Sequence, residues 1–102
     1  MKVFLISDNV DTQVGMRLAG ITGVVVHERV EILRELKKAA EDSEMGIILI
    51  TEKNAALVKE EVYKVKHDLP VPIIIEIPDR HGSMMEKDRI IRYIRDSIGI
   101  KI

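Results

Sequence analysis

Four short apolar runs divide the chain, and each is followed by a more polar stretch. The runs cover residues 3–6, 24–26, 46–51 and 72–78. The first and third have almost no polar alternation, which is typical of strands buried on both faces in the middle of a parallel sheet. The fourth run has proline at both ends and Glu76 inside it. These features favour a strand at the edge of the sheet.

The polar stretches carry apolar residues at spacings of three and four, which predicts a helix after each run. We expect Asp8 or Asp11 to cap a first helix that runs to about Gly20, and a second helix to begin at Glu28. A third helix is capped by Thr51 or Asn54, and a fourth spans roughly 85–98. The buried stripes expected on the first three helices are Val14, Leu18 and Ile21; Ile32, Leu33, Leu36, Ala39 and Ala40; and Ala55, Val58, Val62 and Val65.

This alternation of strands and helices predicts an α/β domain with a four-stranded parallel sheet. Crossovers between parallel strands are right-handed, and the two most apolar strands should be central. The expected strand order is therefore 2-1-3-4, a three-layer flavodoxin-like or receiver-like fold with helices on both faces. We expect one domain over residues 1–102, in which 1–77 form the sheet core. Residues 78–102 would form a loop, the last helix and a tail that binds a partner.

Composition narrows the function classes. The 102 residues are 46% hydrophobic and 32% charged, which is usual for a globular domain. The 16 basic and 17 acidic residues give a net charge of −1, which argues against a nucleic-acid or membrane-surface partner. The absence of cysteine excludes disulfides and cysteine-based zinc sites. No signal-peptide pattern and no apolar run near ~18 residues is present. We therefore expect a cytoplasmic protein without membrane insertion.

Polar residues gather at the expected carboxyl edge of the sheet, where ligands bind in such folds. They are Ser7, Asp8, Asn9, Asp11, Thr51, Glu52, Asp79 and His81. An acidic cluster there could hold Mg²⁺, but aspartate and threonine at these places also cap helices, and we favour capping. The alternative that stays open is a small-molecule or nucleotide binder, or a pseudo-receiver adaptor, that uses this edge.

The sequence contains none of the following catalytic or phosphate-binding motifs. A phosphate-accepting receiver needs an aspartate where Thr51 stands, and it has a fifth strand. The glycines fit neither GxGxxG nor GxxxxGK[ST], and no serine sits in a Gly-x-Ser-x-Gly turn. The three histidines are far apart and lack ligand spacing. We therefore expect no catalytic residue, no cofactor and no bound metal.

The expected last helix has a distinct surface. Isoleucines fall within a narrow arc, and Arg89, Arg92 and Arg95 form a ridge spaced by three. The stripe either packs on the sheet or is shared with a partner, and arginine is favoured at interfaces. The candidate partner-binding residues are Arg80, His81, Arg89, Ile90, Arg92, Tyr93, Ile94, Arg95, Ile98 and Ile100.

Several segments together resemble the F subunit of V-type and A-type rotary ATPases. They are Ser7-Asp8 followed by 15–21, then 46–52, 72–79 and 98–102. The resemblance implies a non-catalytic component of the central stalk, the rotor of an ATP synthase or ATP-driven ion pump. Such a component binds the D subunit of the stalk, with the catalytic A/B ring as a further contact. It couples ATP hydrolysis or synthesis to H⁺ or Na⁺ transport while lying in the cytoplasm, peripheral to the membrane.

Overall fold

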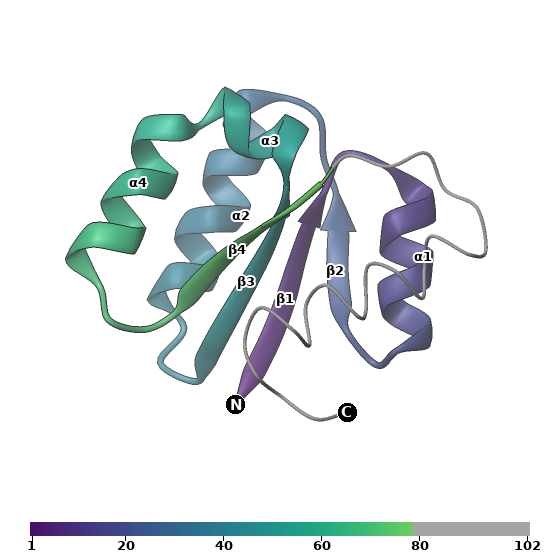
Figure 1. Cartoon of the computed structure of the whole chain (residues 1–102), viewed down its shortest axis with the longest axis horizontal. Coiled ribbons are helices and arrows are strands. Elements are labelled where there is room, and N and C mark those ends of the chain that lie inside the picture. Colours follow the sequence, from purple (N-terminus) through teal and green to yellow (C-terminus); the bar gives the residue numbers. More distant parts are fainter. Residues whose placement is uncertain (79–102) are drawn as a thin grey trace.

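The computed structural model describes residues 1–78 of the chain. Four strands form one parallel sheet in the order β2-β1-β3-β4, as the sequence predicts (Figure 1). The predicted last helix and the tail lie outside the described residues. No helix within residues 1–78 has the length and apolarity needed to cross a membrane. In chain order the elements are β1 (Lys2–Ser7), α1 (Val10–Leu18), β2 (Thr22–Val25), α2 (Arg29–Glu41), β3 (Met45–Thr51), α3 (Glu52–Leu57), α4 (Lys59–Asp68) and β4 (Ile73–Ile77).

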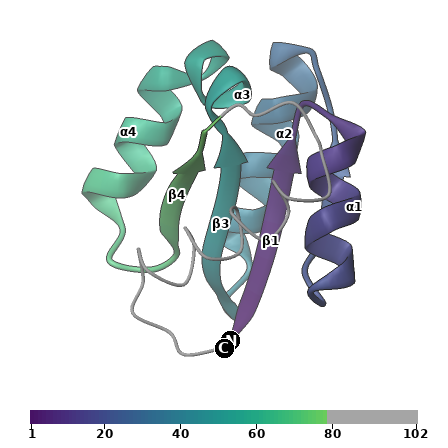
Figure 2. The same cartoon turned by 45° about the vertical axis from the view of Figure 1, so that its right-hand side comes forward.

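Helices cover both faces of the sheet. Figures 1 and 2 show α1 on one face and α2, α3 and α4 on the other. Successive residues of a strand point to opposite faces, so β3 contributes to two separate apolar clusters. Leu49 packs in the cluster that contains Met16 of α1, whereas Ile48 packs in the cluster that contains Ile32 of α2. Every residue of β3 is buried, which confirms that this strand is central.

The first helix differs from the prediction in its cap and its buried face. Asn9 caps α1, because its side-chain oxygen accepts a hydrogen bond from the Thr12 N–H at 2.7 Å. Neither Asp8 nor Asp11 has this role. The predicted stripe is also wrong for Leu18, whose side chain is 73% exposed, whereas Met16 is buried.

The turn that ends α1 accounts for part of this error. Gly20 has a positive φ of 85°, a conformation that glycine adopts without steric cost. Ile21 lies beyond this turn and donates its N–H to the Met16 carbonyl at 2.9 Å. It is therefore out of helical register with Val14 and Leu18, although its side chain packs against the α1-side cluster.

The second predicted helix agrees with the structure, whereas the third is divided in two. A capping box between Glu28 and Glu31 begins α2, whose buried residues are Ile32, Leu36 and Ala39. The single helix predicted after β3 is wrong, because Val58 leaves the helical region (φ −133°, ψ 38°) and separates α3 from α4. Val58 itself is buried in the core, at 1% exposure. The predicted stripe survives the break, since the remaining members are buried or packed against the core: Ala55, Val62 and Val65.

Candidate functional site

The carboxyl edge of the sheet brings together polar groups from β1 and from the start of α1. The Ser7 hydroxyl donates to the Asn9 carbonyl at 2.7 Å and accepts from the Asn9 N–H at 3.0 Å. The Asn9 side-chain amide donates in turn to an Asp8 carboxylate oxygen at 3.4 Å. Ser7 is fully buried. These bonds shape the turn that leads into α1, so the groups serve the fold directly.

A second set of bonds ties this turn to distant elements. Thr51 is the N-cap residue of α3, as predicted, but its side chain makes no capping hydrogen bond to that helix. The Thr51 hydroxyl instead accepts from the Asp8 N–H at 3.2 Å. Asn54 lies inside α3 rather than at its cap, and its side-chain amide donates to the Val26 carbonyl at 3.0 Å. Thr51 and Asn54 are both about 1% exposed. Buried polar groups need such partners, and here each partner belongs to another segment of the chain.

The metal interpretation of this edge receives no support from the described part of the chain. Residues 1–78 contain no group of three or more histidine, aspartate or glutamate side chains placed to hold an ion. Asp79 and His81, the other two predicted members of the edge, lie outside the described residues. The edge instead contains a turn whose side chains are hydrogen-bonded to one another and fix the start of α1.

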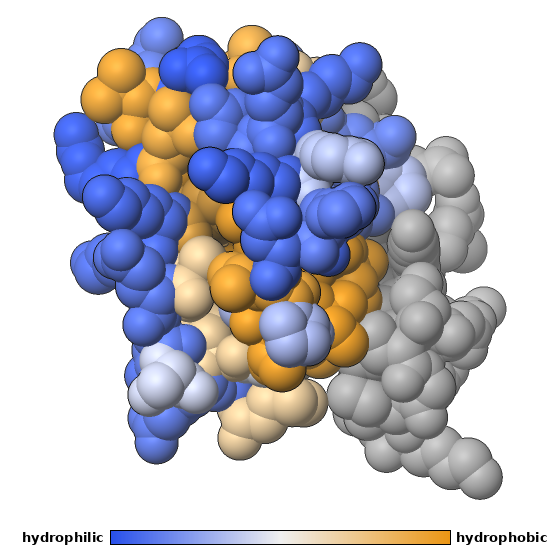
Figure 3. Space-filling view, turned by 90° about the vertical axis from the view of Figure 1, so that its left-hand side faces the viewer, coloured by the Kyte–Doolittle hydropathy of each residue, from blue (hydrophilic) through white to orange (hydrophobic). Residues whose placement is uncertain are grey.

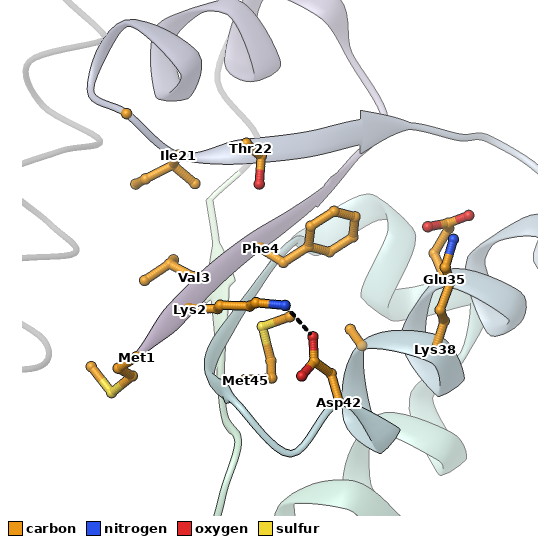
Figure 4. Close-up of a pocket in the computed structure, with 12 residues that line it drawn as sticks. Met1, Lys2, Val3, Phe4, Ile21, Thr22, Glu35, Lys38, Asp42 and Met45 are labelled. Atoms are coloured by element: carbon orange, nitrogen blue, oxygen red, sulfur yellow. Dashed lines mark hydrogen bonds and ion pairs between the residues drawn. The ribbon is translucent and has the colours of Figure 1, made fainter.

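A cavity of about 570 Å³ opens at the opposite, amino end of the strands. Its walls come from β1, the turn before β2, the last turns of α2 and the start of β3 (Figure 4). Phe4 forms part of its apolar lining, and Glu35 and Lys38 project from α2 beside each other. The volume falls in the range of small-ligand sites, but the location is the reverse of the carboxyl edge that the sequence predicts.

Lys2 forms ion pairs at the rim of this cavity. The Lys2 ammonium donates to an Asp42 carboxylate oxygen at 2.8 Å (Figure 4). This hydrogen bond raises the pKa of Lys2 above its ordinary value and lowers the pKa of Asp42. The Glu44 N–H also donates to Asp42 at 2.9 Å and lowers its pKa further. Because both side chains are open to solvent, the pair contributes little to stability.

The β4 side of the molecule carries a groove of about 670 Å³ between the strand and α3–α4. Its lining includes Ala55, Val62 and Tyr63, and an ion pair of 3.1 Å joins Lys66 to Glu76 beside it. Figure 3 faces this side and shows hydrophobic atoms gathered across its middle, bordered by hydrophilic atoms. The large apolar side chains that are exposed at the start of β4 and just before it are Leu69, Val71 and Ile73.

The candidate sites predicted from the sequence differ from those found in the described residues. All ten predicted partner-binding residues, from Arg80 to Ile100, lie outside the described residues. Conversely, the amino-end cavity was not predicted, because its rim pairs residues 40 positions apart in the chain. A charge pattern along the sequence gives no signal for such a pairing.

Comparison with known proteins gives a consistent result over the whole chain. The family model described as ATP synthase (F/14-kDa) subunit matches residues 3–94. The F subunit of the A-type ATP synthase of Methanocaldococcus jannaschii is 32% identical, and the alignment covers 100% of this chain and 99% of that protein. The corresponding F subunits of Pyrococcus abyssi and Thermococcus kodakarensis are 36% and 35% identical, with 100% of this chain and 98% of each relative covered. The resemblance seen in the sequence is thereby confirmed, and the chain belongs to the F-subunit family of A/V-type rotary ATPases.

Proposed function

We propose that this chain is a non-catalytic component of the central stalk, where it binds the D subunit of the rotor. In this role it helps to couple ATP hydrolysis or synthesis to H⁺ or Na⁺ transport, on the cytoplasmic side of the membrane. The observation that carries the proposal is the full-length similarity to F subunits of A-type ATP synthases. The bonded turn at the carboxyl edge supports it, because Ser7, Asn9 and Thr51 already bond to the fold itself.

Three measurements test the two halves of this proposal, the binding to the D subunit and the absence of catalysis. Co-expression with the D subunit from the same genome should give a complex that survives affinity purification and gel filtration. The isolated chain should show no ATP hydrolysis, and incubation with acetyl phosphate and Mg²⁺ should add no phosphoryl group to its mass. Failure to bind the D subunit would refute the stalk assignment. A stable phosphoryl adduct at Asp8 would refute the non-catalytic assignment and favour a receiver-like role.

The partner surface that we propose first is the segment from Pro78 to Ile102, with a further contact to the catalytic A/B ring. Arg89, Arg92 and Arg95 would pair with acidic side chains on the D subunit, since arginine forms bidentate pairs with carboxylates. Changing all three to glutamate should weaken the complex while the far-ultraviolet circular dichroism spectrum stays unchanged. A matched control reverses three exposed basic residues elsewhere, Arg34, Lys37 and Lys64. Equal affinities of the two triple variants would show that the arginine ridge is only a solvated face.

A further inference from the structure

The β3–β4 half of the sheet is buried on the face that carries α1, although α1 lies over the other half. Leu49 of β3 is fully buried, and Ile77 of β4 is 1% exposed. Ile47 and Ile75 are buried beside them, and all four side chains belong to the α1-side cluster. We call these four residues the β3–β4 face. Side chains on a bare sheet face would be open to water, so a further layer of atoms lies over this one.

The helices within residues 1–78 do not supply that layer. On this face α1 packs against β1 and β2, and Figures 1 and 2 show it toward the β2 side of the sheet. The helices α3 and α4 pack against β3 and β4, but on the opposite face, together with α2. Because neighbouring strands are about 4.8 Å apart, β4 lies about 10 Å beyond β1. The Met16 side chain of α1 joins the cluster but is too short to enclose both outer strands.

The layer has a boundary on β4. Side chains alternate along a strand, so Ile73 points to the same side of the sheet as Ile75 and Ile77. Ile73 is nevertheless 52% exposed, and Val71 just before the strand is exposed as well. The layer therefore covers the middle and the carboxyl end of β4, next to Pro78, where the described part of the chain ends.

We infer that residues 79–102 of the chain itself form this layer, and that the isoleucines of the predicted last helix contact the β3–β4 face. The segment starts at the carboxyl end of β4, and residues 79–84 leave about six positions for the connection, a usual length. A helix over 85–98 is about 21 Å long, close to the ~23 Å of the seven-residue strand β3. The occupant therefore has the right starting point and the right length.

The pattern of the predicted helix fits one buried face. The apolar residues that share an arc of about 100° are Ile90, Ile91, Ile94 and Ile98. The arginine ridge is centred about 150° away from the middle of that arc. A helix that places these isoleucines on the sheet leaves the arginine ridge in solvent. The two uses of the stripe that the sequence leaves open are thereby reduced to one, packing on the sheet.

This assignment narrows the partner surface of the segment. Isoleucines that belong to the chain's own core are not available to a partner, so the arginine ridge carries the contact with the D subunit. Arginine is suited to this contact because it pairs with carboxylates through two parallel hydrogen bonds. Only this last step rests on the proposed function, since the cover of the β3–β4 face does not need the D subunit.

Methyl nuclear magnetic resonance of the full chain tests the cover directly. With the isoleucine and leucine methyl groups labelled, nuclear Overhauser contacts should join Ile94 to Leu49 or Ile77. Ile32 is the matched reference, because it is equally buried in the cluster on the α2 side and should show no contact with Ile94. Contacts absent between the isoleucines of 85–98 and the β3–β4 face would overturn the inference.

Urea denaturation of two variants of the predicted helix tests the packing energy. Ile94→Ala should raise the equilibrium constant of unfolding at least about tenfold, because it removes a buried side chain. Arg92→Ala, on the opposite side of the same helix, should change it by less than about twofold. Alanine favours a helix at least as well as either residue, so a loss reports packing and not helix propensity. Equal constants for the two variants would contradict the assignment of the stripe to the sheet.

The face in question is tested by combining Ile94→Ala with mild changes in β3. Leu49 and Ile48 are adjacent and fully buried, and they belong to clusters on opposite faces of the sheet. With Leu49→Val the combined effect on the unfolding constant should differ from the product of the single effects by more than about twofold. With Ile48→Val the effects should multiply. The reverse result would place the segment on the α2 side and refute the inference.

Two further measurements separate the remaining occupants. In a mixture of differently labelled copies, contacts of Ile94 that arise between molecules would assign the cover to a second copy and overturn the inference. When the D subunit is added, the contacts between Ile94 and the β3–β4 face should persist. Their loss on binding would show that the isoleucines pass to the partner, against the inference. Absence of D-subunit binding with these contacts intact would refute the proposed function alone.

Discussion

Replacing Ile48 by alanine tests whether β3 carries the core on the α2 side. Ile48 is fully buried and is paired in register with Phe4 of β1 and Ile74 of β4. It packs in the larger apolar cluster, which also contains Ile32 of α2. Because strands flank this position on both sides and α2 covers it, the neighbouring side chains have little freedom to fill a vacated volume.

The expected magnitude follows from the atoms removed. The change deletes three carbon atoms, which at ~0.8 kcal/mol for each buried methylene gives roughly 2.4 kcal/mol. The cavity that cannot collapse adds to this value, so the free energy of unfolding should fall by about 2–5 kcal/mol. A domain of this size is stable by only about 5–15 kcal/mol, so the loss is a large share of the total.

Urea denaturation followed by circular dichroism measures this loss. Ile73→Ala is the matched control, because Ile73 lies in the edge strand β4 and is 52% exposed. It should cost about 1 kcal/mol, and the exposed Lys38→Ala well under about 1 kcal/mol. The slope of the denaturation curve should stay the same for all three variants. Equal midpoints for Ile48→Ala and Ile73→Ala would refute the central position of β3.

Four further changes probe local features of the fold. Asn9→Ala removes the cap of α1 and should lower stability by about 1 kcal/mol in the same urea assay; no loss would mean that the cap is dispensable. Gly23→Ala places a Cβ 2.7 Å from the Leu5 carbonyl oxygen and should cost about 1–3 kcal/mol. A Cβ at Gly46 has the flexible Met1 side chain as its nearest neighbour, so Gly46→Ala should cost less, and the reverse order would contradict this packing. Asp42→Asn removes a carboxylate whose pKa lies below its ordinary 3.8. Its ion pair stabilises the fold above that pH and is lost as the pH falls through the lowered pKa, so the wild type's advantage in urea midpoint should shrink there; an advantage independent of pH would exclude the ion pair as its source.

Local patterns in the sequence were sufficient to predict the strands and their order in the sheet. The unbroken apolar run at 3–6 marks a strand that must be covered on both faces, as strands in the interior of a parallel sheet are. The same argument places 46–51 beside it, and Glu76 with the flanking prolines assigns the last strand to the edge. The stripe of α2 was also predictable, because its thirteen residues span enough turns to define one face.

The buried faces and the capping residues of the shorter helices could be assigned only from the tertiary structure. In the nine-residue α1, both the row Val10, Val14 and Leu18 and the set Thr12, Gly15 and Met16 satisfy helical spacing. Periodicity cannot choose between two such faces, and the more apolar one proved to be the exposed one. Asn9 was preferred over its neighbouring aspartates as the cap because the path of the chain, fixed by Ser7, brings its side chain to the Thr12 N–H.

Contacts between residues far apart in the sequence could not be predicted from the sequence. The sequence indicated polar residues at the carboxyl edge but gave no sign that Thr51 would bond the Asp8 N–H, or that Asn54 would reach the Val26 carbonyl 28 positions away. Such partners are set by which strands pair and in which register, and a shift by one residue would exchange the faces of a whole strand. The sequence by itself therefore determined the four strands, their order and the family of this protein. The tertiary structure alone decided which polar groups the fold uses and which apolar face of α1 it leaves exposed, because both depend on residues that only folding brings together.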